Sequence, residues 1–229
     1  MSKGRNYKGI EIFRVVAAFL VIAIHTSPLT TYSQTADFIF TRVIARVAVP
    51  FFFMVTGFFV LSKGTDVRRF LKKTAIIYAA SAALYLPINV YAGHLQSWDM
   101  IDLVQQVFFE GTFYHLWYLP AAILGAWLTW MLMRRLSSGA CLAAVAVLYL
   151  LGLLGDSYWG LVENVPVISS VYNALFALMG YTRGGLFFAP IFMWLGAQLR
   201  YAIPRGAGFE IAGLIVSFAL MLAEALNAR

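Results

Sequence analysis

Long apolar stretches recur along the chain, separated by short segments that hold charge, proline or glycine. A helix of about 20 apolar residues is long enough to cross the hydrocarbon core of a bilayer. Backbone groups in lipid must be bonded within their own segment, so each stretch is predicted to be an α-helix. The pattern predicts about seven transmembrane helices, at residues 9–27, 43–62, 74–92, 116–133, 139–155, 184–199 and 208–226.

Two connecting segments, residues 93–115 and 156–183, are too long to be simple turns. We expect short interfacial or partly re-entrant helices in both. Aromatic residues crowd the end of the first segment, up to Trp117 and Tyr118. Such a cluster is typical of the headgroup level of a membrane, which Trp and Tyr favour.

The composition supports the same class of protein. Hydrophobic residues make up 62% of the 229 positions and charged residues 12%, about half the charge of a soluble domain. We therefore predict an all-α integral membrane protein, a polytopic bundle in one domain over residues 1–229. The single cysteine, Cys141, excludes an internal disulfide. The net charge of +7 does not indicate nucleic-acid binding, because it follows from where Lys and Arg lie relative to the membrane.

The distribution of Lys and Arg predicts a cytoplasmic N-terminus. With that orientation, twelve Lys and Arg residues lie in inner segments and four in outer segments, a clear positive-inside bias. Arg14 interrupts the first apolar run, and no small-residue cleavage site follows it, so an uncleaved helix is expected rather than a signal peptide. An odd number of spans places the C-terminus outside. The chain stops directly after an apolar run, which indicates a truncated larger bundle.

The first predicted helix carries two polar residues of interest, Arg14 and His25. They are eleven residues apart, which places them on one face and roughly 16 Å apart along the axis. Arg14 has a structural interpretation as a side chain that snorkels to the inner headgroups, helped by Glu11. His25 has one as a hydrogen-bonded interior residue. The functional interpretation joins them, with Arg14 binding a phosphate or carboxylate and His25 transferring a proton.

Further polar residues are predicted at the outer level of the membrane. Arg46 opposes the positive-inside trend, and His115 and Arg183 each begin a predicted span. Each fits an interfacial belt of polar and aromatic residues, as does Trp117. Together they also fit the wall of a pocket for an anionic or polyhydroxylated group. Substrate-binding roles are therefore predicted for Arg46, His115, Trp117 and Arg183.

The inner basic group around Arg68, Arg69 and Lys72 is the strongest topology signal. Topology alone accounts for it, although it also suits a phosphate-rich cytosolic ligand as an inner counterpart of Arg14. The sequence contains no metal-ligand spacing, P-loop or dinucleotide fingerprint, so no metal is predicted.

These residues resemble the acyltransferase-3 family of membrane proteins. Phe13-Arg14 with His25 eleven positions after the arginine is similar to that family's Arg-x10-His signature. Three further blocks match: Arg46 to Phe58, His115 to Pro120, and Thr182 to Phe188. The four blocks occur in the expected order and are spread from residue 9 to about 200, nearly the whole chain. The chain departs from the family at Gly184, where asparagine is usual, and in having about seven helices rather than about ten.

A narrower resemblance is to the membrane half of VanT-type membrane-bound serine racemases of bacteria resistant to vancomycin-type glycopeptides. It is carried by three segments: Gly9 to Arg14, Ile24 to Leu29, and Gly155 to Leu161. Those proteins also carry a cytoplasmic pyridoxal-phosphate racemase domain, which this sequence does not contain. We therefore expect no pyridoxal phosphate and no racemase activity in this chain alone.

The family resemblance implies a multi-pass protein of the bacterial cell membrane that transfers an acyl group. The donor would be acetyl-CoA or another acyl-CoA, and an unknown acceptor would lie at the outer face. Arg14 and His25 would then be catalytic, and Arg68, Arg69 and Lys72 would bind the CoA phosphates. The narrower resemblance implies an alternative, a module that takes up or delivers L-serine to a downstream racemase domain. A third interpretation is a membrane anchor with a vestigial pocket.

Overall fold

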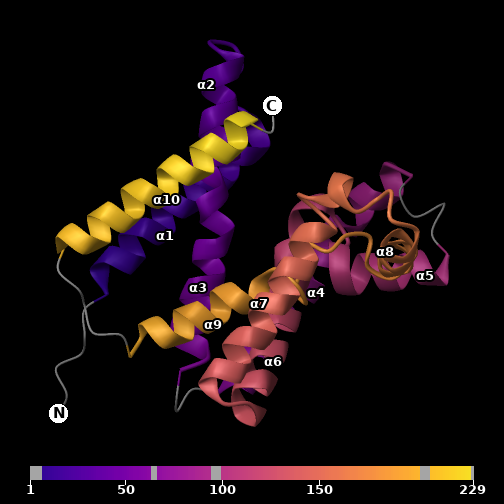
Figure 1. Cartoon of the computed structure of the whole chain (residues 1–229). Coiled ribbons are helices and arrows are strands. Elements are labelled where there is room, and N and C mark those ends of the chain that lie inside the picture. The colour runs from indigo at the N-terminus through magenta and orange to yellow at the C-terminus, as the bar shows by residue number, and fades with distance from the viewer. Residues whose placement is uncertain (1–6, 63–65, 94–98, 202–206, 228–229) are drawn as a thin grey trace. The chain divides into compact units, whose positions relative to one another are not determined.

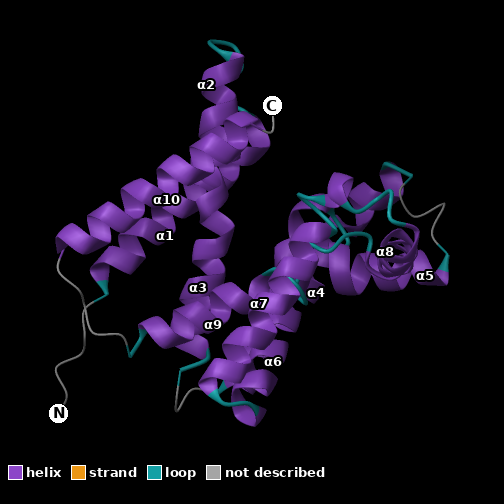
Figure 2. Cartoon of the chain, viewed as in Figure 1, coloured by secondary structure: helices purple, strands orange, loops and turns teal. Residues whose placement is uncertain are grey.

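The computed structural model describes residues 7–62, 66–93, 99–201 and 207–227. Every regular element in these ranges is helical, as Figures 1 and 2 show, which confirms the all-α prediction. Five of the residues used to predict the orientation lie outside the described residues: Lys3, Arg5, Lys63, Arg205 and Arg229. The chain divides into two compact units, the first formed by Met1–Val55 with Tyr201–Arg229 and the second by Thr56–Arg200.

The first unit is built around α1 and the irregular helix that follows it. Its elements are α1 (Lys8–Thr26), α2 (Gln34–Phe38), the π-helix η1 (Ile39–Ile44), the 3-10 helix η2 (Ala45–Val47), the first part of α3 (Ala48–Val60) and α10 (Ala207–Asn227). The residues from Gln34 to Val60 form one helical run of 27 residues. Both η1 and η2 contact α1, and η1 also contacts α10.

The second unit holds the remaining helices. They are α4 (Val67–Tyr91), α5 (Met100–Gln105), the π-helix η3 (Gln106–Glu110), the 3-10 helix η4 (Tyr114–Trp117), α6 (Tyr118–Arg135), α7 (Ser138–Leu154), the 3-10 helix η5 (Trp159–Leu161), α8 (Pro166–Met179) and α9 (Ala189–Leu199). Helix α6 lies at its centre and packs against both α4 and α9, while α7 packs against α9.

Small residues let the helices of the second unit approach closely. A Cβ atom on Gly125 of α6 would lie 2.6 Å from Cβ of Ala189, and one on Gly185 would lie 2.7 Å from the carbonyl oxygen of Ala121. Ala122 and Ala126 are also buried along α6. Lipid supplies no hydrophobic force between apolar helices, so membrane helices associate through close packing of such small side chains.

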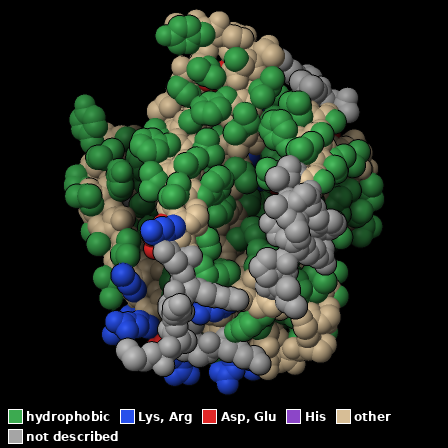
Figure 3. Space-filling model, turned by 90° about the vertical axis from the view of Figure 1, so that its left-hand side faces the viewer, with side chains coloured by type: hydrophobic (Ala, Val, Ile, Leu, Met, Phe, Trp, Pro, Cys, Tyr) green, Lys and Arg blue, Asp and Glu red, His purple; other side chains and the backbone are tan. Residues whose placement is uncertain are grey.

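The outer surface of the helices is strongly apolar. Ile12 in α1 is 66% exposed, Leu84 in α4 is 76% exposed and Leu214 in α10 is 72% exposed. Figure 3 shows large apolar side chains over much of the visible face. Water would disfavour apolar patches of this size, but hydrocarbon would not. The exposed surface therefore agrees with helices that lie in a bilayer.

Four of the predicted spans are confirmed as helices long and apolar enough to cross a membrane: Lys8–Thr26, Gln34–Val60, Val67–Tyr91 and His115–Arg135. Helix α7 is shorter, at 17 residues. The predicted span 184–199 differs more, because Gly184 to Phe188 form turns and α9 begins only at Ala189. The total of about seven spans and the cytoplasmic N-terminus stay predictions.

The two long connecting segments contain short helices, as predicted. Residues 93–115 hold α5, η3 and the start of η4, and residues 156–183 hold η5 and α8. The first segment is anchored to α4 by two hydrogen bonds. The Tyr78 hydroxyl donates to the carbonyl oxygen of Val107 at 2.8 Å, and Nδ2 of Asn89 donates to that of Thr112 at 2.6 Å.

Candidate functional site

Arg14 and His25 lie in the same uninterrupted helix, α1. Eleven residues of α-helix amount to three turns and about 20°, so both side chains project from one face and are separated by roughly 16 Å along the axis. Both side chains are exposed. The helical frame on which the predicted pair depends is therefore present.

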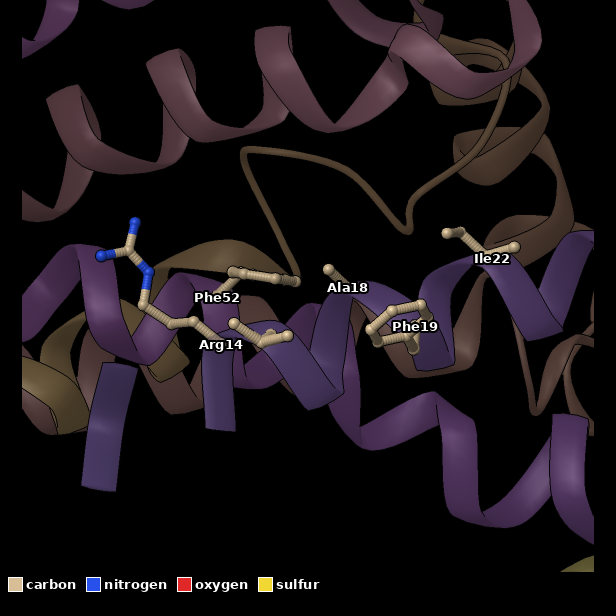
Figure 4. Close-up of a pocket in the computed structure, with 6 residues that line it drawn as sticks. Arg14, Ala18, Phe19, Ile22 and Phe52 are labelled. Carbon is tan, nitrogen blue, oxygen red and sulfur yellow. The ribbon is translucent and has the colours of Figure 1, made fainter. Parts of the chain in front are cut away.

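An open groove runs along this face of α1. It has a volume of about 470 Å³ and is lined by Arg14, Val15, Ala18, Phe19, Ile22 and Phe52. Figure 4 shows Arg14 at one end of the row and Ile22 at the other. Arg14 is the only charged residue of this lining, so the groove combines one cationic end with an apolar body.

His25 continues the row of residues that lines the groove, although it is not itself part of the lining. Arg14, Ala18, Ile22 and His25 follow one another at spacings of four, four and three residues. Residues at these spacings stack along one helix face. His25 therefore lies one turn beyond the apolar end of the groove, in the last turn of α1.

The far wall of the groove comes from the second helical run. The rings of Phe13 and Phe51 meet edge to face with their centroids 4.6 Å apart. Ala17 of α1 and the helix-start residues Ala45 and Ala48 are fully buried. These small side chains allow a close approach that places Phe52 against the Arg14 side of α1.

Arg46 lies in η2, next to the π-helical turns of η1. The backbone register changes there from π to 3-10 and then to α, just before Pro50. Proline lacks the N–H that a regular helix needs at this position. Arg46 is exposed and belongs to the same unit as Arg14 and His25, but it is not among the residues that line the groove.

The remaining predicted pocket residues belong to the second unit. His115 and Trp117 lie in η4. The ring of Phe113, just before η4, stacks on Tyr85 with the ring centroids 4.5 Å apart. Its centroid lies 5.8 Å from that of the His115 ring. The exposed His115 is thus part of an aromatic layer. The larger pocket that would combine these residues with Arg46 stays a prediction.

Arg183 has a partner that the sequence did not identify. Its Nη1 lies 3.7 Å from Oδ2 of Asp156, and the two side chains are 49% and 27% exposed. The preceding residue, Thr182, is fully buried and donates its hydroxyl to the carbonyl oxygen of Gly152 at 2.8 Å. The backbone at Arg183 is thus tied to the end of α7, while its guanidinium stays accessible to solvent.

The sequence also gave no indication of a role for Glu110 at the end of η3. The carboxylate accepts a hydrogen bond from Gln106 and lies where a Cβ atom on Gly180 would be. Burial raises the pKa of the Glu110 carboxyl above its ordinary value, against the opposing effect of the bond from Gln106. Gly180 ends α8 with a φ of +74°, so this contact joins the two long connecting segments.

The predicted phosphate-binding residues Arg68, Arg69 and Lys72 lie in the first two turns of α4, and all three are exposed. Oδ1 of Asp66 caps this helix, accepting from the backbone N–H groups of Arg68 at 3.1 Å and Arg69 at 3.3 Å. Their charged ends are therefore available to an anion. Within the described parts of the chain, no group of three or more His, Cys, Asp or Glu residues is placed to hold a metal ion.

Comparison with known families identifies the family to which the chain belongs. Residues 7–227 match the sequence model of the acyltransferase domain of the acyltransferase-3 family. The chain belongs to the acyltransferase-3 family. The family is membrane-embedded, which agrees with the four long apolar helices. Arg14 and His25 have the spacing of its Arg-x10-His signature.

Relatives of this chain carry racemase names. The chain is 43% identical over 99% of its length to an amino-acid racemase of Enterococcus faecalis, of which the match covers 33%. It is 41% identical over 82% of its length to a second amino-acid racemase of that species, covering 28%. It is 39% identical over 84% of its length to a serine/alanine racemase of Enterococcus gallinarum, covering 29%. The chain thus spans about a third of these relatives, and no solved structure matches it.

Proposed function

We propose that this acyltransferase-3 chain transfers an acyl group from acyl-CoA, typically acetyl-CoA on the cytoplasmic side, to an acceptor at the outer face of a bacterial cell membrane. The observation that carries the proposal is the groove on α1, with Arg14 at one end and His25 one turn beyond the other. The guanidinium would bind an anionic group of the donor. The apolar body would hold the acyl-bearing arm, so that the thioester reaches His25.

The reaction requires a base close to the thioester that takes a proton from the acceptor. The acceptor oxygen or nitrogen attacks the acyl carbon, His25 takes the acceptor's proton, and the carbon–sulfur bond breaks. The proton then passes to the departing CoA thiolate. A neutral imidazole suits this step because its pKa lies near physiological pH. In a second version of the same proposal, His25 carries the acyl group transiently before the acceptor takes it.

The size and charge of the groove favour an acyl donor over a free amino acid. Its volume of about 470 Å³ lies within the range of sites that hold drug-sized ligands, and serine is far smaller. A zwitterionic amino acid also carries an ammonium group, which carboxylates bind through charge-assisted hydrogen bonds. The residues that line this groove provide a cation but no carboxylate.

The other predicted residues extend this proposal. Arg68, Arg69 and Lys72 would bind the CoA phosphates on the inner side, since arginine donors fit phosphate oxygens in pairs. Arg46, His115, Trp117 and Arg183 would shape the acceptor pocket and stabilise negative charge as the acceptor attacks. The accessible guanidinium of Arg183 supports such a role.

The first test is calorimetric binding of acetyl-CoA to the purified chain in detergent. We expect binding to the wild type and a loss of affinity of at least about tenfold in Arg14→Ala, because a charge-assisted bond disappears. Arg135→Ala is the matched control, since Arg135 is an exposed cation at the end of α6. Equal affinity in the wild type and Arg14→Ala would contradict the assigned role of the groove.

A second test addresses the chemical step. His25→Ala should bind acetyl-CoA as the wild type does but transfer no acyl group to an acceptor preparation of bacterial membranes. His25→Gln, which keeps a polar side chain of similar size, should fail equally, because an amide is not a base at neutral pH. Acyl transfer that persists in both variants would remove the core of the proposal.

The racemase names of the relatives favour one other candidate function, delivery of L-serine to a racemase domain. The same Arg14 would then bind the serine carboxylate. Labelled serine uptake by cells with and without the full-length protein separates the two candidates. Uptake that falls on deletion, together with serine binding and no acetyl-CoA binding, would favour delivery. An anchor role would leave both ligands unbound.

A further inference from the structure

The turn that ends α1 contains a residue in the left-handed conformation. Ser27 has a φ of +44° and is the only non-glycine residue with a positive φ among the described residues. L-amino acids rarely adopt this left-handed conformation. The backbone N–H of Ser27 donates to the carbonyl oxygen of Ala23 at 3.0 Å, which closes the helix two residues after His25.

Hydrogen bonds inside the following loop hold Ser27 in place. The backbone N–H and the hydroxyl of Thr30 both donate to the carbonyl oxygen of Ser27, at 3.2 and 2.9 Å. The backbone N–H groups of Tyr32 and Ser33 both donate to the carbonyl oxygen of Leu29, at 2.9 Å each. Leu29 is therefore the residue on which the second half of the loop closes.

Asp37 connects this loop to the next helix. Its Oδ1 accepts a hydrogen bond from the backbone N–H of Leu29 at 2.9 Å. The side chain is buried, with 8% of its surface exposed. Its backbone carbonyl accepts the hydroxyl of the buried Thr41 at 2.8 Å. Burying a carboxylate is costly unless it is hydrogen-bonded, and the bond from the Leu29 N–H meets part of that need.

We propose that Asp37 is a positioning residue for His25. The bonded path runs from the Asp37 carboxylate to the N–H of Leu29, through the closed turn to Ser27, and from its N–H to Ala23 in the last turn of α1. This path fixes the position of the end of α1. It therefore also sets where the His25 ring lies relative to the groove and in which direction it points. The inference rests on the proposed function of His25, because orientation matters only if the ring transfers a proton or an acyl group.

Three substitutions test the proposal. Asp37→Ala removes the acceptor and should lower kcat about tenfold to a hundredfold, because small misplacements of a reacting group have effects of that size. The Kd for acetyl-CoA should stay unchanged, since the groove lining is untouched. Asp37→Asn keeps an oxygen acceptor for the N–H of Leu29 and should restore most of kcat. If Asp37→Ala does not fold, Asp37→Glu replaces it, because the longer side chain misplaces the acceptor.

Asp99→Ala is the matched control. Asp99 also accepts from backbone N–H groups, those of Ile101 and Asp102 at 2.8 Å each, but it caps α5 in the other unit. It should leave kcat unchanged. A wild-type kcat in Asp37→Ala, or a kcat that falls equally in Asp37→Ala and Asp37→Asn, would overturn the proposal.

A second readout does not depend on acyl transfer. The chain has three histidines, so the imidazole resonances of the labelled protein can be assigned with His25→Gln. The His25 resonance should shift in Asp37→Ala, and amide exchange of Ser27 and residues 29–33 should accelerate, with neither change in Asp37→Asn. An unchanged His25 resonance in Asp37→Ala would overturn the positioning role. A shifted resonance in a chain that transfers no acyl group would instead reject the proposed function and leave the structural link intact.

Discussion

Gly57 of α3 lies directly against the backbone of Met193 in α9, so closely that a Cβ atom on Gly57 would overlap the Met193 carbonyl oxygen. One residue further along α3, Phe58 receives Arg200 from the end of α9. Nη1 of Arg200 donates to the carbonyl oxygen of Phe58 at 3.3 Å, and its guanidinium lies 5.6 Å from the Phe58 ring. The glycine in the block from Arg46 to Phe58 therefore serves helix packing.

Gly57→Ala should destabilise the protein by about 1–3 kcal/mol, the usual cost of forcing an extra carbon into a packed core. The opposing backbone cannot move aside as a flexible side chain would. Unfolding in detergent by heat or denaturant measures the effect. Gly139→Ala is the control, because nothing lies within 4 Å of its added Cβ, and there alanine should be neutral or slightly stabilising. Equal stability of the two variants would contradict the packing interpretation.

Thr182→Val should lower stability by about 1–2 kcal/mol. The substitution conserves shape but leaves the buried carbonyl oxygen of Gly152 without the hydroxyl that donates to it at 2.8 Å, and an unmet buried acceptor costs about this much. Ser170→Ala is the comparison, because the Ser170 hydroxyl makes a similar bond at an exposed position. The same unfolding assay should show a clearly smaller change for Ser170→Ala.

The ion pair of Arg183 and Asp156 should contribute little to stability. The charges are 3.7 Å apart and partly exposed, and exposed pairs are usually worth less than about 1 kcal/mol. Arg183→Gln should therefore unfold nearly as the wild type does but reduce acyl transfer if the guanidinium binds the acceptor. Asp156→Asn, which frees Arg183 and removes no cation, should retain activity. A large loss of stability in Arg183→Gln would indicate a structural role instead.

The stability of the chain should fall as pH rises through the titration of Glu110. Its pKa is raised in the folded state by burial, so the folded protein binds more protons than the unfolded one between the ordinary and the raised pKa. Stability is then greatest below this window and declines across it. Thermal unfolding should show Glu110→Gln gaining stability relative to the wild type above the window, with a smaller difference below it. An identical pH dependence in both proteins would contradict this.

The predicted orientation can be tested by labelling single cysteines in cells. The buried Cys141 is first replaced by alanine. Ser157→Cys, at an exposed position after α7, should react with a membrane-impermeant maleimide in intact cells. Leu136→Cys, at an exposed position between α6 and α7, should react only after lysis. The reverse result would place the N-terminus outside.

The sequence by itself determined the class of protein and the line of the candidate site. Apolar runs of membrane-spanning length require helices, and the eleven-residue interval requires Arg14 and His25 to share a face, because both properties depend only on local helical geometry. The same local rules placed short helices in residues 93–115 and 156–183. They failed at residues 184–199, where glycines and Pro190 delay the start of α9 to Ala189.

Only the tertiary structure decided which partners these side chains meet. Arg183 pairs with Asp156, Glu110 packs against Gly180, and Gly57 packs against Met193. The groove forms between α1 and Phe52. Asp37 is buried beneath the loop that follows His25. Each contact except the last joins residues more than 25 positions apart in the sequence. Such contacts depend on how helices pack, and a periodic pattern within one helix carries no information about the helix that will lie across from it.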